Sequence, residues 1–441
     1  MRRILNVLAI ASAALVIGAC AAKIQNTVFP VAVPADVIPV ADFALPPFDE
    51  DVVDVDVISG LIEDLPDAPP PCDLMKAIVE LEHRMLGTEL KVGTKDFRYD
   101  EVRNGSVVHI KDPEKQIALG LVNPLTCETH TTIVVKHGDQ ILTHPSVQIE
   151  PRRRANGIRW NNWATEYTVT KPEGYAVVAT LYPYVQGSGR SRKIIPVFYS
   201  PYSAILHTPN MVENGLSYLS GLIASASEEL RRLQVPSRAF PGTLVADHEL
   251  YHEVAMRLDA NEHMDPGEFI LDPRFTADRI HIIIGTNRDR TARYTCSSEK
   301  ACGISQFTDP TYKTMRRNYP AAKLMADSLE GRRDHFNVTK AQLLLLDSDL
   351  ATFIEAFGPD VATDPWVVEG LVAAYNTGAA RVVNVRRIAL KEKLEEWTEA
   401  KGVCSIRNKR IDCLLDETKW YILKDRYLRN EWNRPEGIAR P

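Results

Sequence analysis

The sequence has 441 residues, of which 45% are apolar and 25% are charged, and its formal net charge is −6. This is the composition of a globular protein that is long enough for two or three domains with a sizeable core. The acidic balance and the lack of a long basic run argue against nucleic acid as a partner.

The first residues have the composition of an export signal. Two arginines precede an apolar run over residues 4–16, which is too short to span a membrane. Residues 17–20 read Ile-Gly-Ala-Cys and resemble the lipobox of bacterial lipoproteins. The resemblance implies a signal peptide over residues 1–19 and a lipid on Cys20. With Ala next, it also implies the periplasmic face of the outer membrane; a plain secretory peptide is the alternative.

Six cysteines remain after Cys20, and an exported chain lies where disulfides persist. Proximity in the sequence favours three bridges, and the expected pairs are Cys296–Cys302, Cys404–Cys413 and Cys72–Cys127. Other pairings stay open, because proximity is the only argument for this choice. No Cys-x-x-Cys spacing occurs, so neither a zinc ribbon nor a thioredoxin-like site is indicated.

Taken in order, the chain predicts an α+β, multidomain fold. Residues 20–71 are rich in Pro, Val and Asp, so we expect an extended tether there. Residues 72–205 begin with helical spacing and continue as short β-branched and aromatic runs between turn residues, which predicts a β-rich domain of about six to eight strands. Residues 206–242 have helical spacing and are interpreted as a linker. Residues 243–441 are mostly helical.

Local signals mark several helices of this last region. Residues 309–310 read Asp-Pro, which suits a helix start with the Asp as the cap. Thr339 and Gln342 have the spacing of a capping box and predict a helix start at Thr339. Residues 366–377 are apolar nearly all round, which predicts a central, buried helix.

Three short motifs also lie in the helical region. They are Gly303-Ile304-Ser305-Gln306-Phe307, Ala373-Ala374-Tyr375-Asn376-Thr377-Gly378 and Glu417-Thr418-x-x-Tyr421-x-x-Lys424. In this order they resemble the motifs of lytic transglycosylases, whose catalytic domain has a lysozyme-like fold; Ser305 stands where that family usually has Met. The resemblance implies cleavage of the β-1,4 bond between N-acetylmuramic acid and N-acetylglucosamine in peptidoglycan. The product would be a 1,6-anhydro sugar, formed by one Glu as acid and base with no metal or cofactor. The substrate-binding residues that it implies are Gly303, Ser305, Gln306, Tyr375, Asn376 and Tyr421.

The resemblance requires a catalytic Glu at the end of the first long helix, which we expect at residues 247–263. The residues that share one face of this helix are Tyr251, Ala255, Leu258 and Glu262. A carboxyl that continues an apolar face is partly desolvated, and desolvation raises its pKa toward the value that a general acid requires. Glu262 is therefore the candidate, although His263 follows it where the family has Ser. The second choice is Glu268, and the structural alternative for either is an ordinary helix-end acid.

Two other functions compete with this one. Residues 248–252 read His-Glu-Leu-Tyr-His, which places two imidazoles on one helix face for zinc. A zinc metalloprotease through His248 and His252 is therefore one alternative, and a polar helix face is the structural explanation of the same residues. The second is a catalytically degenerate, glycan-binding scaffold. The expected partners are peptidoglycan strands, the membrane through the lipid on Cys20, and envelope proteins through the β-rich domain.

Overall fold

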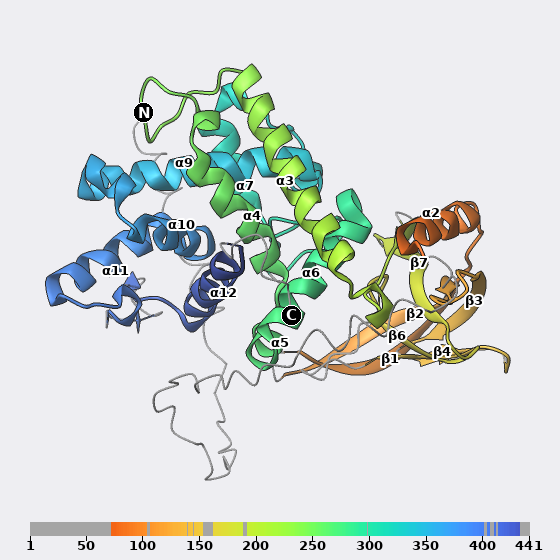
Figure 1. Cartoon of the computed structure of the whole chain (residues 1–441). Helices are drawn as coiled ribbons and strands as arrows, with labels where there is room; N and C mark the ends of the chain where they lie inside the picture. The colour runs from red at the N-terminus through yellow and green to blue at the C-terminus, as the bar shows by residue number, and fades with distance from the viewer. Residues whose placement is uncertain are drawn as a thin grey trace, which may run out of the picture. The chain divides into compact units, whose positions relative to one another are not determined.

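The computed structural model describes residues 72–432, except for residues 104–105, 139, 144, 153–161, 188–191, 298, 401–403, 406–409 and 412. The expected signal peptide, the lipidation site at Cys20 and the tether over 20–71 lie outside the described residues. Residues 70–441 belong to one compact unit. Within it a sheet-rich region precedes a helical region, which confirms the predicted mixture of helix and sheet in that order (Figure 1).

The sheet-rich region holds eight of the described strands. They are β1 (Val92–Arg103), β2 (Ser106–Val122), β3 (Thr129–His137), β4 (Gln140–Leu142), β5 (Gln148–Pro151), β6 (Tyr167–Lys171), β7 (Ala176–Gln186) and β8 (Lys193–Tyr199). The main sheet has the order β4-β3-β2-β7-β8, with β1 paired to β2, while β5 and β6 form a separate antiparallel pair. His137 pairs with Gln140, so β3 and β4 form a hairpin.

Alternation along β2 divides the apolar side chains between the two faces of the sheet. Ala118 and Val122 belong to a cluster that includes helix α2 (Leu74–Met85), and Leu81 of that helix is fully buried. Ile117 and Leu119 belong to the cluster on the opposite face. A helix therefore covers one face of the sheet (Figure 1).

The helical region contains ten α-helices among the described residues. They are α3 (Pro209–Arg232), α4 (Glu249–His263), α5 (Pro266–Leu271), α6 (Pro273–Asn287), α7 (Asp309–Asn318), α8 (Ser328–Arg333), α9 (His335–Phe357), α10 (Trp366–Thr377), α11 (Ala379–Glu392) and α12 (Asp416–Trp432). Short 3-10 turns connect several of them, and strands β9 (Cys404–Ser405) and β10 (Arg410–Ile411) form a small antiparallel pair. No helix in the described part of the chain is long and apolar enough to cross a membrane.

The segment expected as a linker, 206–242, is instead part of the core. Met211 near the start of α3 belongs to the apolar cluster shared with the sheet, and Leu219 further along belongs to the core of the helical region. The helix crosses α6 with Gly215 against Gly285. A methyl group at Gly215 would lie 2.0 Å from the carbonyl oxygen of His281, so only glycine permits this approach.

Two helix starts differ from the predicted ones. The cap of α7 is Thr308, whose side chain accepts from the Thr311 N–H, and Asp309 lies in the first turn. Helix α9 begins at His335 and is capped by Asp334, so the capping box predicted at Thr339 and Gln342 is wrong. Both of those side chains are fully buried inside the helix. The predicted helix over 366–377 is confirmed as α10, and it is buried among the other helices.

Two predicted disulfides are present, Cys72–Cys127 and Cys296–Cys302. The first attaches the N-terminus of α2 to the turn that precedes β3. The second closes the short loop before Gly303. Cys413 is also disulfide-bonded, while the side chain of its predicted partner, Cys404, lies outside the described residues.

Candidate active site

Helix α4 carries Glu262 on its last turn. The residues predicted to share its face, Tyr251, Ala255 and Leu258, are fully buried, which confirms the apolar face. Glu262 continues that face but is only partly buried, so its carboxyl lies between the core and the solvent. A side chain in this position can lose much of its hydration and still reach a ligand.

Helix α12 holds the end of α4 through side-chain hydrogen bonds. The Tyr421 hydroxyl donates to Glu262 Oε1 over 2.8 Å. Lys424 Nζ donates to the carbonyl oxygens of Asn261, at 2.7 Å, and Met264, at 2.9 Å. A lysine at this position adds a donor to carbonyl groups at the C-terminal end of α4 and complements the negative end of the helix dipole.

Burial raises the pKa of Glu262 to about 7, because the desolvated carboxylate is disfavoured. The Tyr421 hydrogen bond and the positive charge of Lys424 oppose this shift, whereas the negative charges of Asp259 and Glu417 add to it. A carboxyl with this pKa is protonated in a large fraction of molecules at neutral pH. It can therefore donate a proton and afterwards accept one.

The loop over residues 302–307 lies beside the end of α4. His263 Nε2 is 2.7 Å from the carbonyl oxygen of Ile304, so that nitrogen carries the proton and donates it. Burial lowers the pKa of His263 to about 4, which keeps the imidazole neutral at neutral pH. His263, which follows Glu262 in the chain, thus attaches the loop to the helix.

Gly303 has a structural reason to be glycine. Its φ is +80°, and a methyl group there would lie 1.9 Å from the carbonyl oxygen of Arg332. The Arg332 guanidinium in turn donates to the carbonyl oxygens of Lys300 and Phe307, at 2.7 Å and 3.1 Å, on either side of the loop. Gly303 is buried in this arrangement, so it shapes the loop and does not expose a backbone group for binding.

Helix α10 contacts the same loop. The Tyr375 hydroxyl donates to the carbonyl oxygen of Ser305 over 2.6 Å, and the Ser305 side chain is fully buried. Asn376 accepts a hydrogen bond of 2.7 Å from the Thr418 hydroxyl on α12. Gln306 donates to the Gly303 carbonyl within its own turn, at 2.6 Å. Tyr375, Asn376 and Gln306 are partly exposed and can contact a ligand, whereas Gly303, Ser305 and Tyr421 are buried.

The three motifs therefore meet in space. Hydrogen bonds connect α4 to the loop, the loop to α10, α10 to α12, and α12 back to α4. These bonds join residues that are 41, 70, 42 and 159 positions apart in the chain, in that order. The result is one closed ring of contacts that includes the Glu262 carboxyl.

Glu268, the second choice for the catalytic acid, is used differently. Its carboxylate forms an ion pair of 2.5 Å with Arg279 of α6. The same guanidinium also pairs with Glu166 over 2.9 Å, and all three side chains are largely buried. This triad connects α5 and α6 to the sheet-rich region, which is a structural task.

The two histidines of the His-Glu-x-x-His sequence have separate partners. His248 precedes α4, stacks on Phe240 with ring centroids 4.4 Å apart, and contacts the Thr243 hydroxyl through Nε2 at 2.9 Å. His252 Nε2 lies 2.8 Å from the Ser227 hydroxyl. Within the described part of the chain, no group of three or more His, Cys, Asp or Glu side chains is placed to hold a metal ion.

Sequence reasoning missed three residues that support the site. Lys424 lies in the third motif, three positions after Tyr421, and this spacing is the signal for a shared helix face. Asp259 has the same relation to Glu262, three positions before it. The Gln342 amide donates to Asp259 over 2.9 Å, but the sequence around Gln342 predicted a capping box and not this contact, because the two residues are 83 positions apart.

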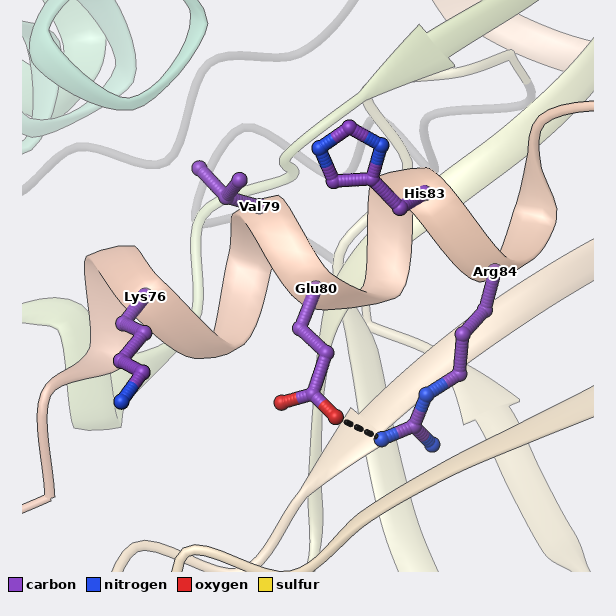
Figure 2. Close-up of a pocket in the computed structure, with 5 residues that line it drawn as sticks. All are labelled: Lys76, Val79, Glu80, His83 and Arg84. Carbon is purple, nitrogen blue, oxygen red and sulfur yellow. Dashed lines mark hydrogen bonds and ion pairs between the residues drawn. The ribbon is translucent and has the colours of Figure 1, made fainter.

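A shallow surface hollow lies elsewhere, along α2. Lys76, Val79, Glu80, His83 and Arg84 line it, and all come from that single helix (Figure 2). Figure 2 also shows the ion pair between Glu80 and Arg84 beside it. The hollow contains none of the predicted site residues. Comparison of the chain with protein-family models, with curated proteins and with solved structures finds no match.

Proposed function

We propose that the chain is a peptidoglycan lytic transglycosylase and that its helical region has a lysozyme-like fold. One observation carries the proposal. Three motifs that resemble this family come together around a partly buried Glu262, whose pKa burial raises to about 7. Such a carboxyl suits a reaction in which one group serves first as acid and then as base.

In the proposed reaction, protonated Glu262 donates its proton to the glycosidic oxygen while the bond from the muramic C1 to that oxygen breaks. The substrate's own N-acetyl oxygen bonds to C1 and stabilises the positive charge, so no second carboxylate is needed. Glu262, now ionised, takes the proton from the muramic C6 hydroxyl. The C6 oxygen attacks C1 and displaces the acetamido oxygen, which gives the 1,6-anhydro product and returns the proton to Glu262.

The neighbouring side chains have distinct roles in this proposal. Tyr421 fixes the orientation of Glu262, and Lys424 lies close enough to stabilise the ionised form after proton donation. Tyr375 holds the loop that carries Gln306, and Gln306 and Asn376 are exposed enough to contact the sugar. The lipobox-like sequence at Cys20 and the disulfides support a lipid-anchored protein on the periplasmic face of the outer membrane, beside its substrate.

The test is incubation of the protein with purified sacculi, followed by mass analysis of the released muropeptides. We expect 1,6-anhydro products from wild type and from Glu249→Gln, which changes an exposed acid at the far end of the same helix. Glu262→Gln should release about 1,000-fold less while its circular dichroism spectrum stays that of wild type. Glu268→Gln tests the second candidate and should retain activity to the extent that it folds.

Other outcomes would replace the proposal. Binding of wild type to sacculi without product release would indicate a glycan-binding scaffold. Cleavage of peptide bonds that a chelator abolishes would indicate the zinc metalloprotease. Anhydro products that persist in Glu262→Gln would leave transglycosylation in place but exclude this residue as the acid.

A further inference from the structure

A second carboxyl, that of Asp259, lies directly behind Glu262 in the same helix. The two residues are three positions apart on α4, a spacing at which side chains are neighbours on the helix surface. Asp259 is fully buried, with 0% exposure, so it cannot touch a polymeric substrate. Any effect that it has on the reaction must therefore pass through Glu262.

The partners of Asp259 are neutral. The Gln342 amide on α9 donates to its Oδ1 over 2.9 Å. Asp259 Oδ2 and the nearby Ser305 hydroxyl are both buried without a well-formed hydrogen bond. Among the described residues, no Lys or Arg is ion-paired with Asp259, in contrast to Asp425, which Arg257 contacts at 2.7 Å.

The ionisable groups around Asp259 are also uncharged or acidic. They are Tyr218 on α3, Tyr375 on α10, Tyr421 on α12 and Glu262 itself. Burial outweighs the Gln342 and Ser305 side chains and raises the pKa of Asp259 to about 6. Asp259 is therefore a buried carboxyl that loses its proton near neutral pH, and the neighbouring carboxyl of Glu262 does so as well.

The groups that face Glu262 come from three sides. Tyr421, Lys424 and Glu417 lie on α12, Asp259 lies on α4, and Tyr375 lies on α10. Lys424 favours the ionised form of Glu262 and Asp259 opposes it. Without Asp259, burial of the carboxyl and the exposed Glu417 would be the remaining influences that oppose the positive charge of Lys424.

We propose that Asp259 is a positioning residue for Glu262: its buried negative charge, one helical turn behind, holds Glu262 in the protonated form that can donate. The proposal rests on the proposed function for its catalytic meaning, but the coupling of the two carboxyls is a property of the protein alone. At neutral pH one proton is bound by the pair, and it resides mainly on the outer carboxyl, Glu262. The Gln342 amide keeps Asp259 in place for this task.

The test is a titration of the full chain in which the side-chain carboxyl carbons of Asp and Glu are labelled with 13C. Loss of one signal in Glu262→Gln and of another in Asp259→Asn assigns the two resonances. The Asn variant keeps an oxygen that can accept from Gln342, so the packing is retained while the charge is removed. We expect the Glu262 midpoint to fall by about half a pH unit in Asp259→Asn.

Glu249→Gln is the matched control. It removes one negative charge from the same helix, on the order of 20 Å away along the helix axis at 1.5 Å per residue. The Glu262 midpoint should not move in this variant. An unchanged midpoint in Asp259→Asn, or an equal fall in both variants, would overturn the proposal.

Wild type alone gives a second test if Asp259→Asn fails to fold. Coupled carboxyls titrate in two steps, and each resonance then shows both steps. A single step for Glu262 would contradict the coupling. The NMR titrations use no sacculi, so a protein without lytic activity could still show the coupling. The failure of the proposed function is therefore distinguished from the failure of this inference.

The pH profile of muropeptide release tests whether the coupling affects catalysis. In Asp259→Asn the alkaline limb of the pH profile for muropeptide release should move to lower pH by the same amount as the NMR midpoint. A role in packing alone would lower the rate at every pH and leave the limb where it is. That second result would overturn the positioning role.

Discussion

A carboxyl group lies at each end of α4, and the two have different surroundings. Near its start, Tyr251 donates to Asp347, which also accepts from the Tyr319 hydroxyl, the Ser237 hydroxyl and the Arg238 N–H, all at 2.5–2.9 Å. At its end, Glu262 accepts one hydrogen bond, from Tyr421. The Asp347 carboxylate thus connects several segments of the chain through four hydrogen bonds. Burial raises the pKa of the Glu262 carboxyl, so this group keeps its proton up to neutral pH and is able to transfer it.

The largest effect on activity should come from removing the ionisable group of Glu262, at the C-terminal end of α4. Glu262→Gln should lower the rate of muropeptide release by about 1,000-fold, the typical contribution of a general acid and base. Its free energy of unfolding should stay within about 1 kcal/mol of wild type. Release assays and urea unfolding measure the two quantities, and a large loss of stability would show that Glu262 belongs with Asp347 as a structural group.

The opposite result is expected at the start of the helix. Asp347→Ala leaves four donors without this acceptor, three of them on buried residues, and should lower the free energy of unfolding by about 3 kcal/mol. Asp347→Asn retains an acceptor and should cost less. Urea unfolding at pH 7 checks both variants, and a change below about 0.5 kcal/mol would remove the contrast between the two ends.

The pH dependence of stability should distinguish wild type from Glu262→Gln. The folded-state pKa of Glu262, about 7, lies above its ordinary value of 4.5, so the folded protein holds this proton more tightly than the unfolded chain does. Its contribution is fully present below pH 4.5 and is lost as the pH rises through 7, by about 2 kcal/mol. Unfolding free energies at pH 5 and pH 8 should therefore differ more in wild type than in the Gln variant. An equal difference would place the pKa of Glu262 near its ordinary value.

The smallest effect is expected from Tyr421→Phe. The Tyr421 hydrogen bond favours the ionised carboxylate, so its loss should raise the pKa of Glu262, by about half a unit. The alkaline limb of the pH profile should then move up, whereas Asp259→Asn should move it down. A downward shift in Tyr421→Phe would mean that the hydroxyl stabilises the protonated form instead.

The sequence patterns that proved reliable were local ones. The apolar face formed by Tyr251, Ala255 and Leu258 and the buried helix over 366–377 depend on spacing within one element, and both are present. The failures came from tertiary context. Thr339 and Gln342 have the spacing of a helix start, but Asp334 caps the helix earlier, and Gln342 is directed at Asp259 on another helix.

The limits of prediction at the site have the same origin. The motifs predicted which residues lie close together, but they did not predict that Gly303 and Ser305 are buried. Gly303 packs against the Arg332 carbonyl, and the Ser305 carbonyl accepts from Tyr375, so both residues shape the loop. The segment over 206–242 lacks the strong apolar run of a core helix, yet Gly215 lets it pack closely on α6. Contacts between residues far apart in the chain decide these roles.

The central claim is that Glu262 supplies the proton for bond cleavage, and one measurement tests it most directly. The midpoint of the Glu262 carboxyl resonance is compared with the alkaline limb of muropeptide release by the same protein. The account predicts that both lie near pH 7, that both move together in Asp259→Asn and Tyr421→Phe, and that release is lost in Glu262→Gln. An alkaline limb that does not move with the Glu262 midpoint, or muropeptide release that persists in Glu262→Gln, would contradict the claim.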